Sequence, residues 1–340
     1  MYNHQQILAL SFRYRPENVV IESGLLIMKK TSISVVIPAY NSEATLGETL
    51  ASIAQQSVPV DQIIVVDDGS TDSTFDIASG FNQNLVVLST KNNGQGEARA
   101  YGIAQSSTQY IALCDSDDIW ETYHIERRLA LLSDYPDADF TFSDCFSFGG
   151  FANTGQTLLK EAPTAWMDKW AIRDASKFYR LKDPYQALLE FNPAYISGMV
   201  FRRESYDRMG GFQKRYSRWI GEDSEFTRRF ATLDDCVFVG DTQPTWGYRR
   251  HSSNYSAVQW KNIKAKADIL DEHLRLGVVP PPCIGVTCDE RDATRGAAFD
   301  QACWEKASGH VTSLFSELPP TQRTAKRRAK ALFAKAGLFF

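Results

Sequence analysis

The sequence lacks any uninterrupted apolar run of the roughly 20 residues that a bilayer-spanning helix needs, and it shows no clear secretory signal peptide. It also lacks a strong charge of one sign. Its 37 Lys and Arg residues against 41 Asp and Glu residues give a formal net charge of −4, which argues against a general nucleic-acid binder. Intrinsic disorder is excluded, because 43% of the 340 residues are hydrophobic. The composition predicts a globular protein, soluble or peripheral to a membrane, with no nucleic acid among its partners.

Cysteine is scarce too, and the six cysteines form no Cys-x-x-Cys pair. This usage is typical of free thiols in a reduced, cytoplasmic compartment. A zinc site made of Cys283, Cys288, Cys303 and His310 is the alternative, but the spacing is loose for a zinc ligand set. We expect the six cysteines to be free thiols that only contribute to packing.

Residues 1–27 do not resemble the start of a domain, whereas Met28 leads directly into the apolar run Ile33–Ile37. We therefore expect Met28 to be the natural start, and residues 1–27 to be an N-terminal extension that is not native.

Strand-like and helix-like segments alternate from there. Runs rich in β-branched residues predict strands at 33–37, 62–67, 85–89 and 109–114, and the segments between them predict helices at about 43–56, 72–79 and 95–105. Because this alternation is the signature of βαβ units, we predict the α/β class, with a Rossmann-like, mostly parallel central sheet flanked by helices. Ligands bind such sheets beyond the carboxyl ends of the strands.

The alternation stops after residue 145. Residues 146–190 are rich in Trp, Lys and Asp, and we interpret them as a helical flap over a site. A β-like run at 195–201, a helix at 226–233 and a strand at 236–239 follow. Beyond Val258 the pattern turns helical, interrupted by prolines at 280–282, so we place a domain boundary near residue 256 and a helical C-terminal region over 257–340.

Acidic clusters stand at the ends of two predicted strands. Asp67 and Asp68 follow the second strand, and Asp115 and Asp117 follow the fourth. Such carboxylates supply the hard oxygen ligands that Mg²⁺ and Mn²⁺ prefer, and these ions neutralise a diphosphate leaving group. The alternative is a plain turn, because Asp and Ser favour loops. Two clusters at one sheet edge favour functional carboxylates.

Five motifs stand in order along the chain: Val35–Asn41, Val65–Asp72, Asn93-Gly94 with Ala98-Arg99, Asp115–Asp118 and Gly221–Asp223. Together they resemble the family 2 glycosyltransferases of GT-A fold, and the likeness covers roughly residues 32–256. The resemblance implies a GT-A domain over 28–256, with a nucleotide-sugar half at 28–145 and an acceptor half at 146–256. It also implies transfer of one sugar from a nucleotide diphosphate sugar, usually a uridine diphosphate sugar, to a glycan or lipid-linked acceptor in polysaccharide or oligosaccharide synthesis.

The resemblance further implies roles for individual residues. Asp68 would bind the nucleotide base, with Ala39 and Tyr40 framing it, and Arg99 would approach the nucleotide. Asp115 would touch the ribose, and Asp117 would coordinate Mn²⁺ or Mg²⁺. The implied nucleotide site is completed by Pro38, Asn41, Gly94 and Ser116.

Asp223 is the candidate catalytic base. Sugar transfer requires removal of a proton from the acceptor hydroxyl, which a carboxylate within hydrogen-bond reach performs, and the resemblance assigns this role to Asp223. The alternative is that Glu222, Asp223 and Glu225 only occupy the first turn of a helix, where the macrodipole favours negative charge. Both interpretations can hold together.

His251 lies in a segment that resembles the one closing over the donor diphosphate in this fold. A neutral imidazole there would complete the metal ligands, and Arg249 or Arg250 would meet phosphate oxygens. A packing or surface histidine is the alternative. Trp219 and Trp246 are candidate platforms for sugar rings, or else core aromatics.

The chain lacks the Gln-x-x-Arg-Trp motif and the transmembrane helices of processive relatives, which implies a single-transfer enzyme. Inversion at the anomeric carbon follows from one direct displacement. Three alternatives stay open: a sugar-phosphate nucleotidyltransferase, which would want a Gly-rich basic loop after the first strand; a non-catalytic sugar-nucleotide or glycan-binding module; and a hydrolase, in which Thr normally stands where this chain has Asp118.

The C-terminal tail has no acidic residue after Glu317. Apolar residues recur there at helical spacing beside a basic set: Arg323, Lys326, Arg327, Arg328, Lys330 and Lys335. This pattern predicts a basic amphipathic helix suited to an anionic membrane surface, at the inner face of the cell membrane. A helix docked on its own protein is the alternative.

Overall fold

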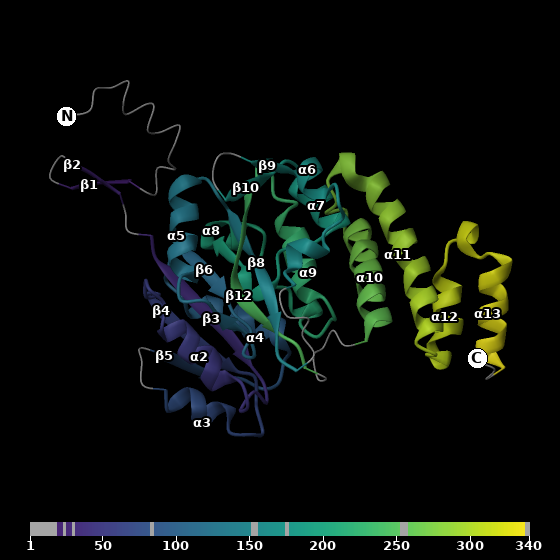
Figure 1. Ribbon diagram of the computed structural model, residues 1–340, viewed down its shortest axis with the longest axis horizontal. Coiled ribbons are helices and arrows are strands. Elements are labelled where there is room, and N and C mark those ends of the chain that lie inside the picture. The colour runs from purple at the N-terminus through teal and green to yellow at the C-terminus, as the bar shows by residue number, and fades with distance from the viewer. Residues whose placement is uncertain are drawn as a thin grey trace. The chain divides into compact units, whose positions relative to one another are not determined.

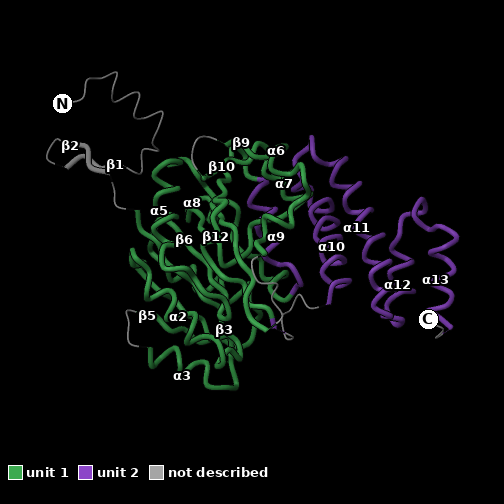
Figure 2. The backbone as a smooth tube through the Cα atoms, viewed as in Figure 1, with its two compact units in different colours: residues 1–218, 233–250 green, residues 219–232, 251–340 purple. Residues whose placement is uncertain are grey.

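The computed structural model describes residues 19–22, 25–28, 31–81, 85–150, 156–173, 177–251 and 258–336. The chain forms two compact units (Figure 2). The first contains residues 1–218 and 233–250, and the second contains 219–232 and 251–340. The candidate base Asp223 therefore belongs to the unit of the C-terminal helices. Nothing in the sequence pattern indicated that 219–232 would group with them.

A mixed sheet of ten strands forms the centre of the first unit. Its strands are β3 (Ile33–Ala39), β4 (Gln62–Asp67), β5 (Leu85–Ser89), β6 (Tyr110–Leu113), β7 (Ile119–Trp120), β8 (Phe140–Phe148), β9 (Ala171–Arg173), β10 (Phe178–Leu181), β11 (Val200–Arg202) and β12 (Phe238–Arg249). Their order is β5-β4-β3-β6-β11-β8-β12-β10-β9, and β7 pairs with β12. The four strands β5, β4, β3 and β6 are parallel, β8 is parallel to β12, and β11 runs antiparallel to both β6 and β8. Before this sheet, β1 (Val19–Glu22) pairs antiparallel with β2 (Leu25–Met28).

Short helices connect the strands of the first unit (Figure 1). The α-helices are α2 (Leu46–Ala54), α3 (Thr74–Ser79), α4 (Gln95–Gln105), α5 (His124–Asp134), α6 (Trp166–Trp170), α7 (Pro184–Glu190) and α8 (Arg203–Arg208). The 3₁₀ helices are η2 (Leu158–Glu161), η3 (Ile196–Gly198) and η4 (Lys214–Tyr216).

The central parallel strands β3 and β4 are buried on both faces, which explains their continuous apolar runs. Every residue of β3 is buried, and so are the last five residues of β4. Helix α4 packs directly on these two strands. Gly102 permits this close approach, because a Cβ at that position would overlap the side chains of Val36 and Val66.

The predicted α/β class is confirmed. The predicted strands 62–67 and 85–89 and the helix 95–105 coincide with β4, β5 and α4. The interpretation of 146–190 as a helical flap was wrong. That segment contains the strands β9 and β10 besides α6 and α7, and β10 joins the central sheet by pairing with β12. The Trp and Lys content reflects local packing, such as Trp170 Nε1 donating to Glu190 (2.9 Å).

Helices make up the described part of the second unit. They are α9 (Glu222–Phe230), α10 (Gln259–Leu276), η6 (Pro281–Cys283), α11 (Ile284–Trp304), α12 (Ser308–Glu317), η7 (Pro320–Gln322) and α13 (Ala325–Lys335). Each of α10 to α13 packs on the next, in the green to yellow part of Figure 1. Their core includes Trp260, Phe299, Val311 and Leu314. The predicted helical C-terminal region is therefore present. In the part of the chain that the structure describes, no helix has the length and apolar character needed to cross a bilayer.

Candidate functional site

The carboxyl ends of β3, β4 and β6 meet at one edge of the sheet. Pro38 and Ala39 end β3 beside the last two residues of β4. The backbone N–H of Asp68 donates to the carbonyl of Ala39 (2.8 Å), which holds the two loops together. Tyr40 follows with an exposed side chain. The edge therefore presents an aromatic ring next to the first acidic cluster.

Asn41 fixes the turn after β3. Its backbone lies in the left-handed region (φ 49°), which Asn tolerates better than most residues. Its N–H donates to Ser70 Oγ (2.9 Å), and its Oδ1 accepts from the N–H of Thr71 (2.8 Å). This side chain thus joins the loop after β3 to the loop after β4.

Asp68 is 4% exposed, and its carboxylate binds a backbone turn. One oxygen accepts from the N–H of Asn93 and the other from the N–H of Gly94, both at 2.8 Å. Gly94 has φ 95°, and an added Cβ would lie 2.6 Å from the carbonyl oxygen of Ser217. A side chain at that position would therefore both strain the backbone and clash.

Ser217 braces the same turn and was missed by the sequence analysis. Its Oγ accepts from the N–H of Glu97 (2.7 Å) and donates to the carbonyl of Asn93 (2.9 Å). It lies 120 residues from Glu97 in the chain, and no sequence motif marks it. Only the fold brings it to the start of α4.

Asp115 and Arg99 form an ion pair at the end of β6. The Arg99 guanidinium, 1% exposed, lies 2.7 Å from Asp115 Oδ1. Ser116 follows, with its hydroxyl 2.8 Å from that of Ser42 and its carbonyl accepting from Thr45 Oγ1 (2.9 Å). The structure therefore brings together Arg99, Asp115 and Ser116, three residues that the resemblance assigns to the nucleotide site, and the buried Arg99 guanidinium fixes the orientation of Asp115.

Asp117 and Asp118 point to different environments. Asp117 is half-buried, and its backbone carbonyl accepts from Arg249 Nε (2.6 Å). Asp118 is 1% exposed, and its carboxylate accepts from the hydroxyl of Ser197 (2.6 Å) and the N–H of Arg249 (2.9 Å). Burial, with further repulsion from Asp117 and Asp115, raises the pKa of Asp118 well above its usual range. Asp118 is therefore a brace turned into the protein.

Ser197 is the second brace that the sequence analysis missed. Its hydroxyl accepts from the backbone N–H of Asp115 (3.0 Å) while donating to Asp118, and its carbonyl accepts from Trp120 Nε1 (2.8 Å). The run 195–201 predicts a strand, but its first part forms η3, and this turns Ser197 toward the acidic loop. Arg249 or Arg250 was expected to meet phosphate oxygens; in the structure the Arg249 guanidinium binds the Asp117 carbonyl (2.6 Å) and Glu48 (2.7 Å).

Asp223 and His251 belong to the second unit. Asp223 lies in the first turn of α9, behind Gly221 in the left-handed conformation (φ 77°), and its Oδ1 accepts from the N–H of Ser224 (2.7 Å). The helix-start interpretation of Asp223 therefore holds, and a role as base is compatible with it. His251 is half-buried and directly precedes residues 252–257, which lie outside the described residues.

Glu225 anchors α9 to α10. Its buried carboxylate accepts two hydrogen bonds from Arg229 (2.6 and 3.1 Å), and His273 Nε2 of α10 lies 3.4 Å away. Burial raises the pKa of Glu225, but the hydrogen bonds from His273 and Arg229 outweigh it and hold this pKa below its ordinary value. This pair fixes the helix that carries Asp223.

Two sequence interpretations are corrected. Trp246 is a core residue and no sugar platform, because it is buried in the sheet with its Nε1 donating to the carbonyl of Ser143 (3.4 Å). The zinc alternative is also wrong: among the residues that the structure describes, which include Cys283, Cys288, Cys303 and His310, there is no group of three or more His, Cys, Asp or Glu side chains arranged to hold a metal. None of the six cysteines, all of which lie in the described part of the chain, forms a disulfide bond.

Comparison with known proteins gives a family. Residues 34–253 match the model of "Glycosyl transferase family 2". The "Uncharacterized glycosyltransferase YwdF" of Bacillus subtilis is 26% identical over 278 residues, covering 80% of this chain and 95% of YwdF. The "UDP-Glc:alpha-D-GlcNAc-diphosphoundecaprenol beta-1,3-glucosyltransferase WfaP" of Escherichia coli is 29% identical over 169 residues, 45% of this chain and 67% of WfaP. Several other relatives are matched over less than half of their own length.

A solved structure shows the fold. It is that of S. aureus TarS residues 1–349 in complex with UDP-GlcNAc, with a TM-score of 0.56 and 17% sequence identity over 90% of this chain and 92% of that one. At this identity the likeness concerns the fold.

Proposed function

The chain belongs to glycosyl transferase family 2, and from that premise we propose that it is an inverting, non-processive glycosyltransferase that moves one sugar from a uridine diphosphate sugar to a glycan or lipid-linked acceptor in polysaccharide synthesis. One observation carries the proposal: Asp68, Arg99, Asp115 and Asp117 gather at the carboxyl edge of the parallel strands, where such sheets bind ligands. Family membership argues against a nucleotidyltransferase, a binding module and a hydrolase. The donor and acceptor classes are supported by the name of WfaP.

The loops after β3 and β4 would hold the nucleotide. Tyr40 is exposed beside Asp68, so its ring can cover one face of a base. The two carboxylate oxygens of Asp68, already held by backbone N–H groups, retain lone pairs for a base N–H. Pro38, Ala39, Asn41 and Gly94 shape this part of the site through the backbone contacts described above. Arg99, Asp115 and Ser116 would meet the ribose side of the nucleotide.

The acidic loop suits a divalent cation. Asp117 is half-buried and follows Asp115, whose Oδ1 pairs with Arg99, and carboxylate oxygens are the hard ligands that these ions prefer. The Asp118 carboxylate is turned to Ser197 and Arg249. Mg²⁺ and Mn²⁺ sites often combine one or two carboxylates with substrate phosphates, so a preformed set of three protein ligands is not required. We assign Asp117 as the principal ligand and His251 as a further one. When bound, Mn²⁺ or Mg²⁺ would neutralise the diphosphate and favour its departure.

Asp223 is proposed as the base. The acceptor oxygen attacks the anomeric carbon. The bond between that carbon and the diphosphate oxygen breaks, and its electron pair leaves with the diphosphate. The proton of the acceptor hydroxyl passes to the Asp223 carboxylate. A single displacement of this kind inverts the anomeric configuration. The hydrogen bond from Ser224 N–H fixes the Asp223 side chain, and the Glu225 pair fixes its helix.

The test compares Asp223→Asn with Asp289→Asn. Asp289 is an exposed aspartate on α11 of the same unit, so its variant controls for loss of a surface charge. Release of nucleoside diphosphate from a panel of UDP-sugars and GDP-sugars, with Mn²⁺ and an acceptor extract, should fall at least a hundredfold in Asp223→Asn and stay unchanged in the control. A folded Asp223→Asn protein with wild-type turnover would contradict the assignment. Turnover with GDP-sugars alone would contradict the uridine donor.

We also propose that α13 rests on an anionic membrane surface, peripheral to the inner face of the cell membrane. Its inner side is docked on the protein: Arg327 and Lys330 pair with Asp300 of α11 (2.6 and 3.1 Å). Its outer side exposes Leu332 (68%) and Phe333 (47%). The exposed cations Lys326, Arg328 and Lys335 flank these two side chains. An apolar stripe bordered by cations is the face that binds anionic lipid headgroups.

Vesicle sedimentation tests this surface. The wild-type protein should sediment with phosphatidylglycerol vesicles and much less with phosphatidylcholine vesicles. Binding should be lost when both Leu332 and Phe333 are changed to Ser. Trp304→Ser is the matched control, because Trp304 is 83% exposed at the end of α11 and lies outside the stripe. Equal sedimentation of the double variant and the wild type would contradict the proposal.

A further inference from the structure

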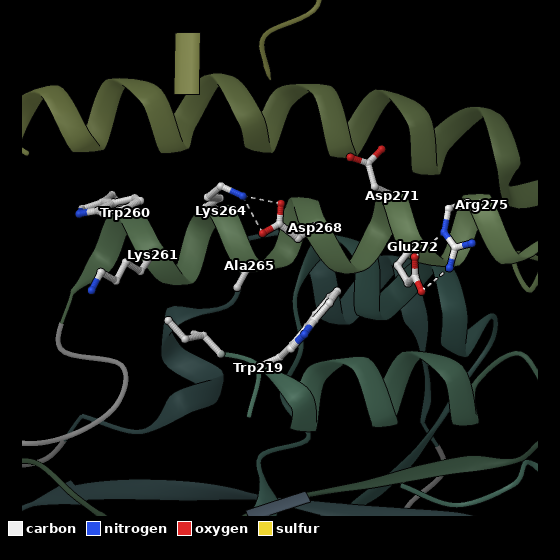
Figure 3. Close-up of a pocket in the computed structure, with 10 residues that line it drawn as sticks. Trp219, Trp260, Lys261, Lys264, Ala265, Asp268, Asp271, Glu272 and Arg275 are labelled. Carbon is white, nitrogen blue, oxygen red and sulfur yellow. Dashed lines mark hydrogen bonds and ion pairs between the residues drawn. The ribbon is translucent and has the colours of Figure 1, made fainter. Parts of the chain in front are cut away.

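The second unit contains a pocket that the donor site does not use (Figure 3). Its volume is about 610 Å³, within the range of small-ligand sites. Trp219 and Ile220 line it from the segment before α9, and one face of α10 lines it from Trp260 to Arg275. In Figure 3 the Trp219 ring points from its own segment toward α10. The pocket therefore lies wholly within one compact unit, between two segments of that unit.

The chemistry of the lining is that of a site for a neutral, hydroxyl-rich ligand. The partly exposed indole ring of Trp219 offers an apolar face, whereas Trp260 is nearly buried and packs in the core of the helices. Six charged side chains line the pocket as well, three cationic and three acidic, so their charges balance. A pocket for a phosphate or a nucleotide would carry an excess of cations, and a pocket for a lipid chain would carry few charges.

Four of the six charged side chains form two ion pairs along α10, whereas Asp271 pairs with Arg291 and Arg295 of α11. Lys264 Nζ contacts both carboxylate oxygens of Asp268 (2.7 and 2.8 Å), and the Arg275 guanidinium contacts both oxygens of Glu272 (2.7 and 2.6 Å). These pairs stand about two turns apart on α10, and their remaining lone pairs and N–H groups can meet sugar hydroxyls. An aromatic face with such polar groups beside it matches a sugar ring, which has apolar C–H faces and a polar edge.

The place of Trp219 in the chain connects the pocket to the reaction. Trp219 stands four residues before Asp223, so their Cα atoms are at most about 14 Å apart. The left-handed turn at Gly221 separates them and starts α9. One acceptor chain can therefore occupy the pocket and still present a hydroxyl to Asp223.

We propose that this pocket binds a neutral sugar of the acceptor glycan, with Trp219 as its stacking platform, an inference that rests on the proposed function. It assigns acceptor selection to α10 and to the segment before α9.

Three variants test the pocket. Trp219→Ala removes the platform, and Trp219→Phe restores an aromatic face. Ala265→Leu narrows the pocket from α10 while leaving Trp219 in place, which guards against a Trp219→Ala variant that fails to fold. Trp304→Ala is the control, since it removes an exposed indole of the same unit outside the pocket.

Binding of cellobiose, maltotriose and tri-N-acetylchitotriose is measured by saturation-transfer NMR, and binding of UDP with Mn²⁺ is measured in parallel by thermal shift. We expect at least one oligosaccharide to bind the wild type and the Trp304→Ala control. We expect about tenfold weaker binding in Trp219→Ala and Ala265→Leu, and recovery in Trp219→Phe. UDP binding should be equal in all variants.

Failure of all three oligosaccharides to bind, or equal binding by Trp219→Ala and wild type, would overturn the pocket assignment. If the wild type binds UDP in these experiments but no sugar, only the pocket assignment fails. If it binds a sugar through Trp219 but no UDP, the donor proposal fails and the pocket assignment stands.

Discussion

Asp118 provides the sharpest test of how the acidic loop is built. It lies next to Asp117, yet its carboxylate is turned inward to the hydroxyl of Ser197 and the N–H of Arg249. If Asp118 is a brace and Asp117 the metal ligand, neutral isosteres at these two neighbouring positions should have opposite consequences. We therefore predict that Asp118→Asn leaves transfer activity near that of the wild type, whereas Asp117→Asn abolishes it.

The size of the effect on stability follows from the contacts. Asp118→Ala leaves the Ser197 hydroxyl and the Arg249 N–H without their acceptor in a buried place, at roughly 1–3 kcal/mol each, so we expect a loss of about 3 kcal/mol or more. Asp118→Asn keeps an acceptor for Arg249 and removes a carboxylate whose pKa is raised by burial. Its change in unfolding free energy should stay within about 1 kcal/mol. Asp117 is half-buried, so Asp117→Asn should also change stability by less than about 1 kcal/mol.

The assay combines urea unfolding with initial transfer rates in Mn²⁺ for Asp118→Ala, Asp118→Asn and Asp117→Asn. We expect Asp118→Ala to be unstable, Asp118→Asn to be stable and active, and Asp117→Asn to be stable and inactive. A stable Asp118→Asn protein as inactive as Asp117→Asn would refute the reasoning, because it would place Asp118 in direct contact with donor or metal.

Three other predictions concern the donor edge, α9 and the metal. Gly94→Ala should cost roughly 1–3 kcal/mol of stability in urea unfolding, because Gly94 has φ 95°, and should weaken UDP binding in a thermal-shift titration; equal UDP affinity would contradict the role of the Asp68 turn. Glu225→Gln should lose about 3 kcal/mol at pH 7, since it leaves the nearly buried Arg229 without its anion. The pKa of Glu225 is lowered in the folded state, so this difference should be full above its ordinary pKa near 4.5 and shrink as the pH falls through the lower folded value; a constant difference down to about pH 3 would disagree. UDP at 100 times its Kd should stabilise the protein by about 2.7 kcal/mol in Mn²⁺ and by far less in chelator, and an equal shift in chelator would contradict metal-assisted binding.

Much of the fold follows from local sequence pattern. The strands 62–67 and 85–89 and the helix 95–105 were predicted at their observed bounds, because apolar period and glycine or proline punctuation act within a few residues. The position of the acidic loop after β6 was also predictable, because the carboxyl ends of neighbouring parallel strands meet at one edge of the sheet. The segment 146–190 resisted such reasoning. Its short strands are stabilised by pairing, β9 with β10 and β10 with β12. A pattern within the segment does not reveal a partner about 60 residues away.

The sequence by itself determined the α/β class, the C-terminal helices and which acidic residues follow the parallel strands. Each of these features depends on residues that are close together in the chain. Only the tertiary structure decided which carboxylates face outward. Ser197 and Ser217, each from a distant segment, orient Asp118 and the turn after Asn93. It also decided that Trp246 packs in the core while Trp219 lines a pocket. Burial and hydrogen bonding of a side chain depend on what the rest of the chain places around it, and that information is not local.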